Sequence, residues 1–243
     1  MVKIMNVSKE TDKLEVRKRI NKLISSARKN AKPKVCELCG KEKTSFCNSH
    51  SVPQMSLRPI ADNGVVLHAS AALGFDKDII NIENGIKKSG TFRYICNDCD
   101  GSFFQDYENP SNILKVPTDK MLGEIAVKNF LLQMSKRSDE IELWNIIQQD
   151  MNAFENFDDG INIKEMDFSE FRSEVKFHKN IVDNKEVGCY QILVWKVLPY
   201  VVPIAMQSAI AVDKDMEGNE INNIYNMDAN VRMQYLHLAI LPV

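Results

Sequence analysis

Cys36-Glu-Leu-Cys39 and Cys96-Asn-Asp-Cys99 are the two segments that decide the fold of the N-terminal half of this chain. In each segment, two residues separate the cysteines, so that one tight turn can direct both sulfurs at a single ion. Two such turns supply the four thiolates of a tetrahedral structural zinc site. Unrelated core cysteines are the alternative, but two pairs with this spacing in one chain favour a metal. We therefore expect one zinc ion to be bound by Cys36, Cys39, Cys96 and Cys99.

The composition limits the class of protein. A chain of 243 residues is long enough for one large domain or two small ones. The net charge of -2 gives no general attraction to polyanions, so a nucleic-acid partner would need a local basic patch. Six cysteines are too few for a disulfide scaffold of this length and suit metal binding in a reducing compartment. We see neither a signal peptide nor an apolar run of ~18 residues, which predicts a cytoplasmic protein with no membrane partner.

The N-terminal segment, residues 1–34, is predicted to be a basic helix. An apolar stripe runs through residues 9–30, and Asp12 with Glu15 can form a capping box. The other face is rich in lysine and arginine. This face is either an ordinary solvated surface or an arm that contacts phosphates and leads into the zinc module.

The rest of the chain predicts an α+β protein with three further parts. A zinc-binding module spans residues 35–115, with strands near 65–67 and 92–95 and a short helix over 101–109 that Pro110 ends. A helical segment spans 116–155, with one helix over 118–135, capped by Thr118, and another beginning at Ser138 or Asp139.

The C-terminal part, residues 170–243, is predicted to be a mostly antiparallel β-sheet that follows an Asn- and Asp-rich connection over 152–170. Its expected strands lie at 175–178, 190–197, 204–212 and 233–241, with 200–202 at an edge between prolines. His178 and His237 alternate with apolar residues, which predicts outward or satisfied positions on the sheet.

The motifs of residues 35–110 resemble those of the zinc-stapled HNH, or ββα-metal, endonucleases. The shared order is Cys36-x-x-Cys39, Ser49-His50-x-Val52-Pro53 and Cys96-x-x-Cys99-Asp100. The Ser-His-x-x-Pro variant and the Cys-Asp-x-x-Phe-Phe-x-x-Tyr-Glu run are similar to a group of bacterial HNH-like proteins that we associate with phage defence. The resemblance implies a ββα-metal module and a metal-dependent nuclease that acts on DNA or RNA, with a role in antiviral defence.

The resemblance also assigns roles to single residues. His50 matches the general base that activates water against a phosphodiester. Asp100 matches a ligand of the catalytic ion, for which a carboxylate suits Mg²⁺ or Mn²⁺. Ser49 departs from the family, which has an acidic metal ligand there. Glu108 or Asp106 could replace that ligand, although a continuous helix would separate Asp100 from Glu108 by ~12 Å. Glu108 is otherwise a surface charge or a salt-bridge partner.

The departure at Ser49 leaves a second function open, a catalytically inactive zinc-scaffolded module that binds nucleic acid or protein. The aromatic residues Phe103, Phe104 and Tyr107 are expected in the core of the small module rather than in a platform for base stacking. We find no glycine-rich nucleotide-binding loop, so an ATPase or a trigger would have to come from a partner protein.

Overall fold

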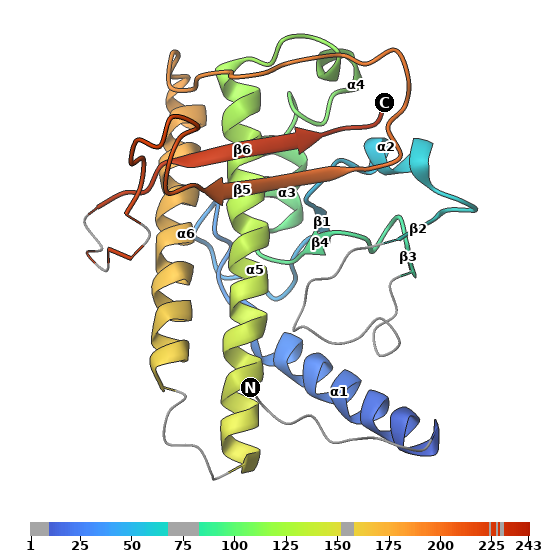
Figure 1. The fold of residues 1–243 in the computed structure, drawn as a ribbon. Helices are drawn as coiled ribbons and strands as arrows, with labels where there is room; N and C mark the ends of the chain where they lie inside the picture. Colours follow the sequence, from blue (N-terminus) through green and yellow to red (C-terminus); the bar gives the residue numbers. More distant parts are fainter. Residues whose placement is uncertain (1–9, 68–82, 152–157, 224, 227, 229–230) are drawn as a thin grey trace.

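The computed structural model describes residues 10–67, 83–151, 158–223, 225–226, 228 and 231–243 (Figure 1). Its helices are α1 (Glu10–Asn30), α2 (Gln54–Leu57), the 3-10 helix η1 (Arg58–Ile60), α3 (Asn97–Phe103), α4 (Pro110–Ile113), α5 (Asp119–Met151) and α6 (Asp158–Asn184). Its strands are β1 (Ser49–His50), β2 (Val65–Leu67), β3 (Glu83–Gly85), β4 (Thr91–Phe92), β5 (Met206–Ala211) and β6 (Tyr235–Ile240).

The strands form three antiparallel pairs: β1 with β4, β2 with β3, and β5 with β6. Helices combined with small antiparallel sheets confirm the predicted α+β class. None of the helices in the described ranges is both long and apolar enough to cross a membrane.

The long helix α5 lies at the centre of the molecule, with α6 beside it and the β5–β6 hairpin crossing both helices (Figure 1). The apolar side of α5 repeats every three or four residues, at Val127, Phe130, Leu131 and Met134, as one face of a helix requires. The same buried cluster contains Cys36 and Cys96, so the cysteine turns share one core with α5. The candidate metal centre is therefore joined to the main core.

Several predicted elements are confirmed near their expected bounds: the helix over 9–30 as α1, the strand at 65–67 as β2, and the two C-terminal strands as β5 and β6. The Thr118 cap is also present, since its hydroxyl accepts a hydrogen bond from the Met121 backbone N–H at 3.3 Å. The Asp12 side chain of the capping box and residues 152–157 of the predicted connection lie outside the described residues, and the rest of that connection, from Asp158, is part of α6.

The expected break near Ser138 or Asp139 is wrong, because α5 continues through both residues to Met151. Asp139 does not cap a new helix but forms an ion pair with Arg28 of α1, with 3.5 Å between Oδ2 and Nε. A polar residue can therefore lie inside a helix when a neighbouring element supplies its partner.

The strand predicted at 175–178 is also wrong, since these residues belong to α6. Four alternating residues are too few to identify a strand, whereas the buried positions Phe171, Val175, His178 and Val182 follow helical spacing. Residues 190–197 and 200–202 form no strand in the described structure. The β-sheet of the C-terminal part is therefore limited to the β5–β6 pair within the described residues.

The two C-terminal histidines belong to a buried polar network between α5, α6 and the hairpin. The Glu174 carboxylate accepts two hydrogen bonds from the Arg232 guanidinium, at 2.6 Å and 2.7 Å. Its Oε2 lies 3.3 Å from Nε2 of His178. His237 approaches the Asn129 side chain at 3.0 Å. Burial, followed by the neighbouring His178, lowers the pKa of His237 to about 4.

This lowered pKa predicts an acid-sensitive contribution to stability. In the unfolded chain His237 becomes protonated below pH ~6.5, whereas in the folded chain it becomes protonated only below about pH 4. The free energy of unfolding should therefore fall between these pH values, by up to about 3 kcal/mol. Urea unfolding of wild type and His237→Leu at pH 4 to 7 measures the effect. We expect the free energy of unfolding of His237→Leu to fall less steeply with decreasing pH than that of wild type. Equal slopes in the two proteins would contradict the lowered pKa of His237.

Candidate metal centre and the adjoining polar cluster

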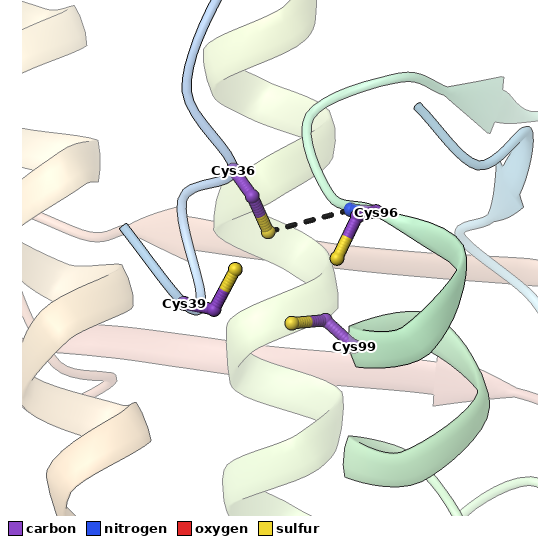
Figure 2. Close-up of side chains that lie close together, drawn as sticks. All are labelled: Cys36, Cys39, Cys96 and Cys99. Atoms are coloured by element: carbon purple, nitrogen blue, oxygen red, sulfur yellow. Dashed lines mark hydrogen bonds between the residues drawn. The ribbon is translucent and has the colours of Figure 1, made fainter. Parts of the chain in front are cut away.

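The four predicted zinc ligands lie together. The sulfur atoms of Cys36, Cys39, Cys96 and Cys99 are all within 4.8 Å of one another and point toward a common centre (Figure 2). Tetrahedral zinc with Zn–S bonds of about 2.3 Å places its sulfurs about 3.8 Å apart, so small adjustments suffice to bind the ion. Cys36 and Cys96 are buried, whereas Cys39 is exposed. The cluster could therefore bind a metal such as zinc, and the residues fit that ion.

Local backbone geometry forms the first cysteine turn. The Gly40 N–H donates to the Cys36 carbonyl at 2.8 Å, and Gly40 has a φ of 67°, in the left-handed region that glycine adopts without strain. The second pair starts at Cys96, just before α3, and places Cys99 in its first turn. A backbone hydrogen bond of 3.1 Å from Glu37 to Tyr94 joins the two turns.

The thiols differ in their electrostatic surroundings. Burial raises the pKa of Cys36 and of Cys99, whereas a hydrogen bond from the Lys41 backbone lowers the pKa of Cys39 to about 7. The Cys96 N–H donates to the Cys36 sulfur at 3.3 Å and favours its thiolate (Figure 2). Because zinc binds thiolates, its uptake by these buried thiols must release protons.

A second polar cluster lies beside the cysteines and is centred on the Lys128 ammonium of α5. Its Nζ is 3.3 Å from the Ser49 hydroxyl, 3.1 Å from the His50 carbonyl and 3.6 Å from Oδ1 of Asp100, and it pairs closely with Glu108. The Ser49 hydroxyl also donates to Asp100 at 2.5 Å. The Lys128 side chain is 0% exposed. Four oxygens from three segments of the chain thus surround one buried positive charge.

Glu108 reaches this cluster because the chain bends after α3. The single helix expected over 101–109 is wrong: α3 ends at Phe103, and Pro110 begins the separate helix α4. The aromatic side chains of Phe104 and Tyr107 between them are fully buried, as expected for core residues. The bend removes the ~12 Å separation of a straight helix. Asp100 and Glu108 therefore approach the same ammonium, one as an ion pair at 3.6 Å and the other in closer contact.

Asp106, the other candidate to replace the missing acidic ligand, and the nearby thiol of Cys47 have partners of their own. Asp106 forms an ion pair with Lys120 at 3.0 Å. Cys47 is not part of the four-cysteine cluster but donates its thiol to Oδ2 of Asp100 at 3.1 Å. Burial, followed by the hydrogen bond to Asp100, raises the pKa of Cys47 to about 12, so this thiol remains protonated.

The His50 imidazole is half-buried and held by a backbone carbonyl. Its Nε2 lies 2.8 Å from the Ile86 carbonyl oxygen, while its own carbonyl contacts Lys128. A carbonyl can only accept a hydrogen bond, so Nε2 carries the proton and the lone pair lies on Nδ1. The structure therefore brings Asp100 and Glu108 together, places the His50 backbone beside them and fixes the His50 ring through Ile86.

Lys128 is the residue of this cluster that the sequence analysis missed. A signal was available on α5, since Glu124, Lys128 and Leu131 follow helical spacing on a side that is otherwise apolar, and all three are 0% exposed. A charged residue at a core-facing position indicates a buried partner. Its partners, however, come from three segments that only the fold brings to α5.

The oxygens around Lys128 are the ligand types that Mg²⁺ and Mn²⁺ prefer. The Lys128 ammonium already contacts all of these oxygens. A divalent ion bound to the same oxygens would lie next to the ammonium, and the two positive charges would repel each other. A catalytic divalent ion thus does not fit this arrangement of side chains.

Comparisons with protein-family models, curated proteins and solved structures found no match for the chain.

Proposed function

We propose that the chain is a zinc-stapled nuclease of the HNH type that hydrolyses nucleic-acid phosphodiesters. The observation that supports this proposal best is the oriented His50 imidazole, whose Nε2–H donates to the Ile86 carbonyl at 2.8 Å. Further support comes from the chain order: β1 and its antiparallel partner β4 lie between the two cysteine turns, with α2, η1, β2 and β3 between them, and α3 follows β4. The motif resemblance suggests the role in antiviral defence.

In this proposal His50 acts through Nδ1. A water oxygen forms the new bond to phosphorus as Nδ1 takes its proton, and the P–O ester bond breaks. The leaving oxygen takes up a proton from solvent, which balances the step. The carbonyl of Ile86 holds the ring in the tautomer that leaves Nδ1 free to accept.

The proposed nucleic-acid surface is the exposed basic side of α1 and the residues that follow it. Among the described side chains it consists of Lys18, Arg19, Lys22, Arg28, Lys29, Lys32 and Lys34. A local surface of this kind can bind phosphates although the whole chain has a net charge of -2. It leads directly into the first cysteine turn at Cys36.

A second candidate function is a zinc-scaffolded module that binds nucleic acid without cleaving it. The Lys128 ammonium favours this candidate, since it lies among the very oxygens that would otherwise be free to bind a catalytic ion. Ser49, which stands where the resembling family has an acidic ligand, favours it as well.

Cleavage and binding assays on the zinc-loaded protein separate the two functions. We expect plasmid DNA or structured RNA to be cut whether or not Mg²⁺ or Mn²⁺ is added, because the Lys128 ammonium already occupies the oxygens that would bind a catalytic ion. Binding of the same substrates in EDTA, measured by fluorescence anisotropy, should weaken when Lys22 and Lys29 are replaced by glutamate, because each lost phosphate contact reduces counterion release. The matched control is Lys179→Glu, on the distant helix α6. Binding without cleavage would select the second candidate, and the absence of both would reject each of them.

A further inference from the structure

The charges around Lys128 are those of a cation-binding centre. Asp100 and Glu108 contribute two carboxylates, and Ser49 and the His50 carbonyl contribute neutral oxygens. An ammonium has three donors for these four oxygens, and the Lys128 Nζ also lies over the face of Phe104, 4.3 Å from the ring centroid. The centre therefore retains one net negative charge with the lysine in place.

Solvent reaches the two carboxylates of the centre but not the ammonium. The side chains of Asp100 and Glu108 are 21% and 36% exposed, whereas Lys128 is 0% exposed. Removing a buried charge from water is costly, and it is tolerated here because the surrounding oxygens replace its hydration. A hard divalent ion needs the same oxygens and bears the same sign of charge, so the ammonium and the ion must compete.

We propose that the Lys128 ammonium is the resident cation of this centre and keeps divalent ions out of it. The centre becomes a divalent-ion site when Lys128 is replaced by an uncharged side chain of similar size. This inference concerns ion binding alone and holds whether or not the protein cleaves nucleic acid.

The direct test is Mn²⁺ binding to the zinc-loaded full chain, followed by the loss of the electron paramagnetic resonance signal of free Mn²⁺. We expect Lys128→Met to bind one Mn²⁺ at least about tenfold more tightly than wild type, since the competing charge is gone. Adding Asp100→Asn to this variant should abolish the gain. The matched control is Lys120→Met on the same helix, whose ion pairs with Asp106 and Glu124 lie outside the centre; it should bind Mn²⁺ as wild type does.

Thermal unfolding gives an independent readout. Without divalent ions, Lys128→Met should melt on the order of 10 °C lower, because two neighbouring carboxylates lose their counterion. Added Mn²⁺ should restore much of this loss and shift the melting temperature of wild type only slightly. Equal Mn²⁺ affinity in wild type and variant, or no rescue of the variant, would overturn the proposal.

A wild-type measurement keeps the proposal testable if Lys128→Met does not fold. Millimolar Mn²⁺ should shift the melting temperatures of wild type and Asp100→Asn by the same small amount, because the ion does not bind at the Lys128 centre in either protein. A larger shift for wild type would show that the ion binds beside Lys128 and would overturn the proposal. Cleavage by wild type is scored separately. If Lys128→Met gains Mn²⁺ binding while wild type cuts nothing, the inference on ion binding stands and the proposed nuclease fails.

Discussion

Cys96→Ser is expected to lose its metal and to unfold the part of the chain around the cysteine turns. Cys96 is buried and belongs to the same core cluster as the apolar side of α5. The ion would join it to Cys36 across a sequence separation of 60 residues, so losing the ion reopens a long loop. Structural zinc contributes on the order of 10 kcal/mol of binding free energy coupled to folding, which is comparable with the total stability of a domain.

Metal analysis and circular dichroism measure this effect directly. Wild type should contain one zinc per chain, and Cys96→Ser should contain much less and lose helical signal. Cys189→Ser is the matched control, because Cys189 is exposed and lies outside the four-cysteine cluster. A Cys96→Ser protein with full zinc content and an unchanged melting temperature would refute the assignment of the ligands.

His50→Ala is expected to reduce nuclease activity by a factor of ~10²–10⁴, the usual loss when a general base is removed. The fold should survive, because the ring is half-buried and its side-chain contact is one hydrogen bond to the Ile86 carbonyl. The initial rate of plasmid or RNA cleavage measures the loss, and circular dichroism confirms the fold.

The matched control for His50 is Thr91→Ala, the residue paired with it across β1 and β4. Thr91 bonds the Lys88 carbonyl and not the imidazole, so its loss should leave the rate close to that of wild type. If His50→Ala cuts as fast as wild type, the proton is taken by another group and the assignment of the base is wrong.

Local patterns were sufficient for a large part of the fold. The helical period of α1, the Thr118 cap of α5 and the strands at β5 and β6 are all encoded by neighbouring residues. At residues 175–178 a short pattern gave a wrong prediction. Four alternating residues suggested a strand, whereas the buried residues from Phe171 to Val182 have the spacing of a helix and belong to α6. The longer pattern wins because a helix of this length buries a continuous apolar face.

The sequence by itself determined the four-cysteine centre, because the spacing within each Cys-x-x-Cys turn dictates where its two sulfurs can point. The composition of the polar cluster was decided by tertiary structure. Because the chain bends after Phe103, Glu108 lies near Asp100. Lys128 of α5, 20 residues after Glu108 in the sequence, contacts both carboxylates. No local signal pairs these residues, because a buried charge selects its partners only when packing has removed the water that would otherwise solvate it.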